Sequence, residues 1–81
     1  MGQEQIRELA RRAAIEVLEL EPGELRDDAD FHAELGGDSL QQLELVTMLE
    51  KQLGVRFRLN HAAEINSVDD AVRIGASYVG T

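Results

Sequence analysis

Three segments of the chain carry apolar residues at spacings of three and four, and glycine or proline separates one segment from the next. Such spacing places the apolar side chains on one face of an α-helix. The segments cover residues 3–20, 39–53 and 67–79. In a chain of 81 residues, helices of this kind bury their apolar faces against one another around one small core. The sequence therefore predicts an all-α fold in a single domain over residues 1–81.

The connections complete this prediction. Residues 55–59 alternate apolar and basic side chains as a strand does, but no second strand is available to pair with them. We therefore expect an extended loop there, followed by a short helical turn near residues 61–65. The result is a small four-helix bundle of three main helices and one short helix, with a long first loop over residues 21–37. The expected core comprises Ile6, Leu9, Ala10, Ala13, Val17, Leu25, Phe31, Leu45, Val46, Leu49, Leu53, Val68, Ala71, Val72, Gly75 and Val79.

The negative charge of the chain is concentrated in its middle. Residues 16–50 contain eleven carboxylates and one arginine, a net charge of −10, within a total of −8 for the whole chain. Such a field repels nucleic acid and anionic membrane surfaces, and it steers basic protein surfaces toward this region. We expect a cytoplasmic, monomeric protein whose partners are proteins, although isolated acidic residues also serve solubility alone.

The chain contains no cysteine, which rules out disulfides, thiolate metal sites and cysteine nucleophiles. Its two histidines, His32 and His61, are far apart in sequence and lack ligand-like spacing, so no metal site is predicted.

The most informative motif lies where the long loop meets the second helix. Gly36 and Gly37 precede Asp38, a good helix N-cap whose carboxylate can accept from the amide of Gln41. Ser39 then becomes the first helical residue, where free amides and the helix dipole favour an attached phosphate. The alternative is a plain helix-start serine. The glycines and the acidic, apolar helix behind Ser39 favour a modification site formed by Gly37, Asp38, Ser39 and Leu40.

This region resembles the acyl carrier proteins and their peptidyl relatives, in which the serine of an Asp-Ser-Leu motif carries a phosphopantetheine arm. The resemblance rests on Asp38-Ser39-Leu40, on Phe31 and Leu35-Gly36, on residues 40–55 and on residues 67–72, and so covers nearly the whole chain. It implies a non-catalytic carrier that holds acyl groups as thioesters on 4′-phosphopantetheine, which a phosphopantetheinyl transferase moves from coenzyme A to Ser39. It also implies that Asp38 assists the metal ion used by that transferase.

The resemblance further implies a docking surface on the second helix for the transferase, a ketosynthase, an acyltransferase or acyl-loading ligase, and other pathway enzymes. Apolar and acidic side chains that lie off the predicted core face suit such a surface. They are Leu40, Leu43, Glu44, Thr47, Met48 and Glu50. For Leu43 and Met48, burial in the bundle is the alternative.

Several functional alternatives remain open. Gly37 before Asp38 resembles carriers of polyketide and nonribosomal-peptide assembly, and we favour a free-standing bacterial carrier of polyketide or related natural-product synthesis. A peptidyl carrier, a fatty-acid carrier and an unmodified helical adaptor are the alternatives. Gly37-Asp38-Ser39-Leu40 also spells the motif of GDSL-type hydrolases. The chain has no Asp-x-x-His motif and is too short for the large α/β scaffold of those enzymes, so the hydrolase alternative is disfavoured.

Overall fold

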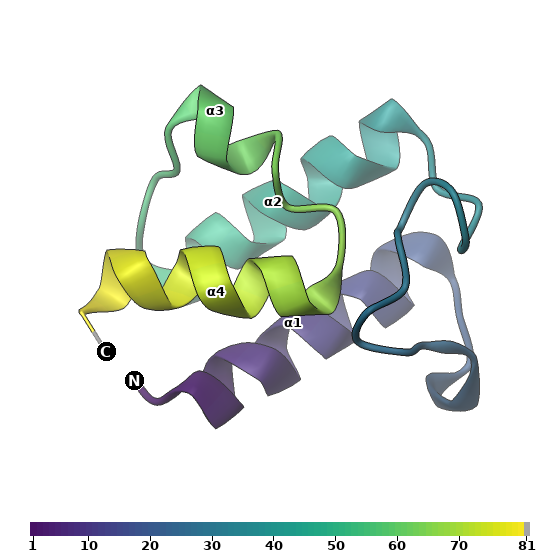
Figure 1. Cartoon of the computed structure of the whole chain (residues 1–81), viewed down its shortest axis with the longest axis horizontal. Helices are drawn as coiled ribbons and strands as arrows, with labels where there is room; N and C mark the ends of the chain where they lie inside the picture. Colours follow the sequence, from purple (N-terminus) through teal and green to yellow (C-terminus); the bar gives the residue numbers. More distant parts are fainter. Residues whose placement is uncertain (81) are drawn as a thin grey trace.

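The computed structural model describes residues 1–80. These residues form α1 (Gln3–Leu18), a 3-10 turn η1 (Pro22–Glu24), α2 (Ser39–Leu53), α3 (Leu59–Ala62) and α4 (Val68–Val79), and they contain no strand (Figure 1). The predicted all-α fold, with three main helices, one short helix and a long first loop, is confirmed. None of the helices in this described part is long and apolar enough to cross a membrane.

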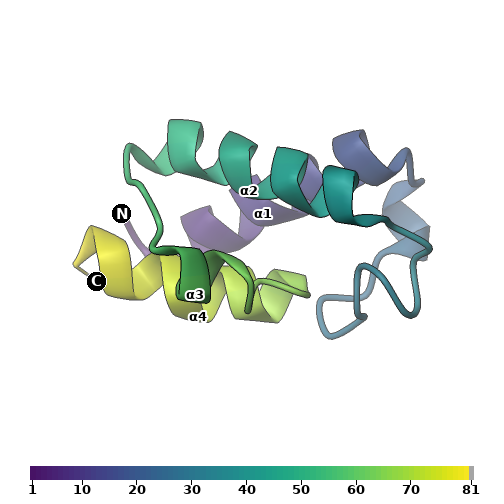
Figure 2. The same ribbon diagram turned by 90° about the horizontal axis from the view of Figure 1, so that it is seen from above.

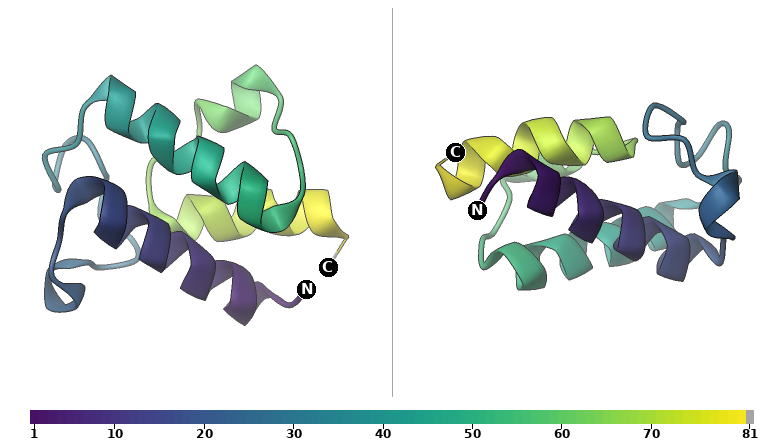
Figure 3. Two further views of the ribbon diagram at one scale, coloured as in Figure 1. Left: turned by 180° about the vertical axis from the view of Figure 1, so that it is seen from behind. Right: turned by 90° about the horizontal axis from the view of Figure 1, so that it is seen from below.

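Helix α1 lies at the centre of the arrangement. Its main helix partners are α4 and α2, and both of these run in the direction opposite to α1 (Figures 1 and 3). The two ends of the chain lie at one end of the molecule, and the long connection between α1 and α2 lies at the other (Figure 2). The start of α2 therefore lies at the end that the long connection covers.

The core is formed by the predicted helix faces, by Leu25 and Phe31 of the long connection, and by Phe57 and Ile65 on either side of α3. Leu25 and Phe31 are both buried, which confirms them as anchors of that connection. Leu9, Val17 and Val79 are only partly buried and pack against the edge of the core. The residues with no exposed surface include Ile6, Ala10, Ala13, Ala14, Leu45, Leu49, Ile65 and Val68.

Two predicted helix boundaries were wrong. Helix α1 ends at Leu18 rather than at residue 20, because Glu19 adopts a left-handed conformation (φ 54°) and its amide donates to the Ile15 carbonyl. The short helix spans Leu59–Ala62 rather than residues 61–65. No side chain caps this helix, so the sequence carries no capping signal for its start.

Gly75 allows α4 to approach the other two long helices closely. A Cβ atom added at Gly75 would lie 3.2 Å from Ile6 Cγ2 of α1 and 3.2 Å from Leu53 Cδ1 of α2. These distances are shorter than ordinary carbon contacts. The space at Gly75 is therefore used for helix packing.

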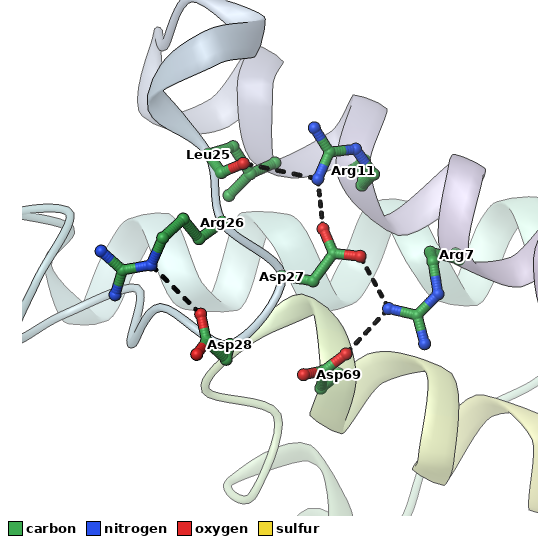
Figure 4. A network of polar contacts seen from close by, with 7 residues as sticks. All are labelled: Arg7, Arg11, Leu25, Arg26, Asp27, Asp28 and Asp69. Carbon is green, nitrogen blue, oxygen red and sulfur yellow. Dashed lines mark hydrogen bonds and ion pairs between the residues drawn. The ribbon is translucent and has the colours of Figure 1, made fainter.

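An ion-pair cluster fastens the long connection to α1 and α4 (Figure 4). The carboxylate of Asp27 accepts from Arg7 (2.7 Å) and from Arg11, and Arg7 also binds Asp69 of α4 (2.8 Å). The Asp69 amide donates to the Asp27 carbonyl (2.9 Å). Partial burial opposes the charge on Asp27, but the hydrogen bonds and positive charges of Arg7 and Arg11 outweigh it and lower the pKa of this carboxyl.

This lowered pKa predicts a loss of stability in acid. The Asp27 carboxylate stabilises the fold above the pKa of the unfolded chain, about 4, and the stabilisation disappears as the pH falls through the lower folded pKa. We expect Asp27→Asn to reduce the free energy of unfolding by roughly 2 kcal/mol at neutral pH. The difference from wild type should shrink between about pH 4 and pH 2 in urea denaturation.

Asp28→Asn is the matched control, because Asp28 is exposed and its ion pair within residues 1–80 is with exposed Arg26. Its effect should stay within about 0.5 kcal/mol. A difference between wild type and Asp27→Asn that does not vary with pH would contradict the role given to Asp27.

Candidate functional site

Two glycines at the end of the long connection bring the chain to the start of α2, each for a different reason. Gly36 has a φ of +74°, which favours glycine over residues with a side chain. Gly37 is buried, and its amide donates to the Phe31 carbonyl (2.8 Å). A Cβ atom at Gly37 would lie 2.8 Å from Leu18 Cδ2 and 2.9 Å from the Phe31 oxygen. The site therefore requires glycine at position 37 because the backbone approaches its neighbours too closely for a side chain.

The turn before these glycines is held by carboxylates. Asp30 Oδ1 accepts from the amides of Ala33 (2.8 Å) and His32 (2.9 Å), and these bonds lower the pKa of Asp30. Glu34 accepts from the Asp30 amide (2.9 Å) and from Arg26 (2.7 Å), which lower its pKa in that order. Both carboxylates therefore remain charged at neutral pH, and their hydrogen bonds hold the turn that precedes Gly36 and Gly37.

Asp38 caps α2 as the sequence predicts. Its Oδ1 accepts from the Gln41 amide (2.8 Å), and Gln41 Oε1 accepts in return from the Asp38 amide (3.0 Å). This reciprocal pair is a capping box, which satisfies two amides at the helix start. Gln41 Nε2 also donates to the Val17 carbonyl near the end of α1 (3.3 Å). The first turn of α2 is thereby fixed to its own cap and to α1.

Ser39 is the first residue of α2 and is exposed. Within residues 1–80 its hydroxyl makes no hydrogen bond, and the amides of Ser39 and Leu40 have no acceptor there. The other two serines differ. Ser67 is buried and accepts from the Asp70 amide (3.1 Å), and the Ser77 hydroxyl donates to the Ile74 carbonyl (2.7 Å). Ser39 is thus the serine whose hydroxyl is both exposed and free to react.

A cleft of about 240 Å³ lies beside Ser39, between α2 and α3. Gln42 stands at its edge, where Nε2 donates to the Ile65 carbonyl (3.1 Å) and to Asn66 Oδ1 (3.1 Å). Sequence reasoning missed this cleft, because its far wall comes from the short helix and the residue after it. The lining residues are Ser39, Gln42, Leu43, Val46, Ala62 and Ala63.

The structure separates the six predicted docking residues into two groups. Leu40 and Leu43 are 64% and 62% exposed, unusually high values for leucine. Glu44 and Thr47 are exposed on the same helix, and the Thr47 hydroxyl donates to the Leu43 carbonyl (2.9 Å). Met48, in contrast, is partly buried and packs against the core. Leu40, Leu43, Glu44 and Thr47 therefore form the accessible part of this surface.

Glu50 also differs from a free docking residue. It is partly buried, and its carboxylate accepts from the amide of Phe57 in the loop after α2 (2.7 Å). A carboxylate engaged in this way holds the loop in place. The spacing of apolar residues showed that Glu50 lies off the core face of α2. It could not show that the loop after α2 brings the Phe57 amide back to the Glu50 carboxylate.

Comparisons with known proteins are consistent with this geometry. The family model described as the phosphopantetheine attachment site matches residues 6–74. The chain is 38% identical over 80 residues to polyketide-8 synthase acyl carrier protein 2 of Streptomyces avermitilis, covering 99% of this chain and 87% of that protein. It is 37% identical over 73 residues to an acyl carrier protein of Prochlorococcus marinus, covering 90% and 91%.

The close approach at Gly37 predicts an asymmetry among glycine substitutions. Gly37→Ala should lower the free energy of unfolding by roughly 1–3 kcal/mol, because the Phe31 backbone and Leu18 must move to admit a methyl group. Gly23→Ala is the matched control, since a Cβ atom there meets nothing within 4 Å. Denaturant titration compares the two variants. Equal stability of Gly37→Ala and Gly23→Ala would show that the approach is not tight in solution.

Proposed function

The chain belongs to the phosphopantetheine-binding family of acyl carrier proteins, and on this premise we propose that Ser39 is the residue to which its arm is attached. The cofactor of this family is 4′-phosphopantetheine, and the chain carries acyl groups on it. When bound, this group supplies a terminal thiol that holds acyl groups as thioesters. The family is one of non-catalytic carriers, which disfavours the hydrolase alternative for Gly37-Asp38-Ser39-Leu40.

The observation that carries the proposal is the free, exposed Ser39 hydroxyl at the start of a capped helix. A phosphodiester at this position would have the unpaired amides of Ser39 and Leu40 nearby, and the positive end of the α2 dipole favours its negative charge. The adjoining cleft has mostly apolar lining side chains, which suit a chain that leaves the helix start. The residues present therefore fit the group.

Each residue around the start of α2 has its own role in the attachment reaction. Ser39 Oγ forms the new bond to the phosphorus next to the pantetheine, and its proton passes to a base of the phosphopantetheinyl transferase. The pyrophosphate bond of coenzyme A breaks, and adenosine 3′,5′-bisphosphate leaves. Asp38 and Gln41 hold the first turn of α2 in place while Oγ reacts. Gly37 brings Asp38 to this position, and Leu40 offers an exposed apolar contact beside it.

The partners are enzymes of the pathway to which the carrier belongs. Besides the transferase, we propose a ketosynthase, an acyltransferase or acyl-loading ligase, and related enzymes that dock on Leu40, Leu43, Glu44 and Thr47. The likeness to a protein named as a polyketide synthase acyl carrier supports a polyketide or related natural-product pathway. The negative charge of residues 16–50 favours fast, exchangeable association with basic surfaces.

Attachment at Ser39 predicts a single change in intact mass. After incubation with coenzyme A and a promiscuous phosphopantetheinyl transferase, wild type should gain one phosphopantetheine and Ser39→Ala none. Ser77→Ala is the control, because Ser77 is also an exposed serine and should leave modification unchanged. Circular dichroism verifies that both variants are folded. Modification of Ser39→Ala, or an unchanged mass of wild type, would overturn the proposal.

The docking surface predicts a salt-dependent rate. Glu44→Lys should lower kcat/KM of the transferase by roughly fivefold at low ionic strength, because it places a like charge opposite a basic partner surface. The loss should shrink as salt screens the interaction. Glu4→Lys makes the same charge change on an exposed residue in the first turn of α1 and serves as control. Equal rates for both variants at low salt would exclude Glu44 from docking.

A further inference from the structure

Helix α3 is the shortest of the α-helices in residues 1–80. It spans four residues, Leu59–Ala62, and none of them is buried. Leu59 is 90% exposed. Buried residues flank this helix, Phe57 before it and Ile65 after it, and within it Ala62 packs against the core from a partly buried position. A segment with so few buried contacts opens locally unless another interaction holds it.

Tyr78 of α4 supplies such an interaction. Its hydroxyl oxygen accepts from the Arg58 amide (2.9 Å) and lies 2.5 Å from His61 Nδ1. Its ring packs edge-to-face against Phe57 and against His61, with ring centroids 4.9 Å and 5.5 Å apart. One side chain of α4 thus contacts the residues before, at the start of and within α3.

Two hydrogen bonds meet at the Tyr78 hydroxyl. The Arg58 amide supplies its own hydrogen to the Tyr78 oxygen. That oxygen has a second lone pair, so the hydroxyl can either donate to His61 Nδ1 or accept from it, depending on the tautomer of the ring.

These contacts bear on the cleft beside Ser39. His61 directly precedes Ala62 and Ala63, which form the α3 side of that cleft. The opposite end of the same segment is held by the hydrogen bonds from Gln42 to Ile65 and Asn66. Ala62 and Ala63 therefore lie between the contact of Tyr78 with His61 and the hydrogen bonds from Gln42.

We propose that Tyr78 and His61 form a clasp that keeps α3 closed over the cleft, which makes Tyr78 a positioning residue for that cleft. An acyl group entering between α2 and α3 must move this wall, so the clasp sets how readily the cleft widens. The link to acyl groups rests on the proposed carrier function. The clasp itself is a property of the unmodified chain and is tested there.

The test is amide hydrogen exchange of unmodified protein, measured by NMR for wild type and Tyr78→Phe. This substitution removes the hydroxyl and keeps the ring. If opening of α3 breaks the clasp, exchange of the Ala62 and Ala63 amides should accelerate roughly three- to tenfold. These amides donate to Arg58 (2.8 Å) and Leu59 (3.0 Å). Their exchange should be insensitive to low concentrations of denaturant, because local opening exposes little surface whereas global unfolding exposes much more.

A purely structural role for the hydroxyl gives a different result. Global unfolding would become easier and the α1 amides would exchange faster, whereas local exchange of Ala62 and Ala63 would remain at the wild-type rate. That outcome would overturn the clasp. Because the protein is unmodified throughout, failure of the clasp is distinguishable from failure of attachment at Ser39.

Two substitutions at His61 complete the test. Asn can place either its amide oxygen or its amide nitrogen near the position of Nδ1, so His61→Asn should keep exchange near the wild-type rate. His61→Leu removes the hydrogen-bonding group and should resemble Tyr78→Phe, and the double variant should show no further acceleration. Independent, additive effects of Tyr78→Phe and His61→Leu would contradict a shared bond.

Discussion

The backbone of Phe31 joins the three parts of the chain on which the site depends. Its amide donates to the Asn66 carbonyl before α4 (2.8 Å), and its carbonyl accepts from the Gly37 amide before α2 (2.8 Å). Because the Phe31 ring is buried as well, the long connection cannot shift without exposing apolar surface. Phe31, a residue of the long connection, therefore fixes the start of α2 relative to the bundle. The positions of Asp38 and Ser39 depend on it.

The distribution of charge complements this geometry. Arg7 and Arg11 of α1 are engaged with Asp27 and Asp69, so these cations secure the long connection and α4. Arg26, the single cation of residues 16–50, is paired with Asp28 and Glu34. Within residues 1–80, most other carboxylates of this stretch have no ion-pair partner, which leaves a negative field around the start of α2.

Periodicity and capping predicted much of this molecule because both are local. The three long helices, the Asp38 to Gln41 cap and the burial of Phe31 all follow from residues close together in sequence. What could not be predicted depends on distant contacts. The residue before α3, Arg58, donates its amide to the hydroxyl of Tyr78, which lies 20 residues later. The Glu50 carboxylate accepts from the Phe57 amide of the following loop. Spacing also cannot show that Gly37 is required by contact with Leu18 and Phe31.

The central claim is that the chain presents one serine hydroxyl, at the start of α2, for esterification. Trypsin cleavage after Arg26 and Lys51 isolates residues 27–51, in which Ser39 is the only serine and Thr47 the only threonine. Tandem mass spectrometry of this fragment from transferase-treated protein tests the claim most directly. The account predicts a phosphopantetheine on Ser39, with Thr47 unmodified. An unmodified 27–51 fragment, or the group on Thr47 or on a serine elsewhere in the chain, would contradict it.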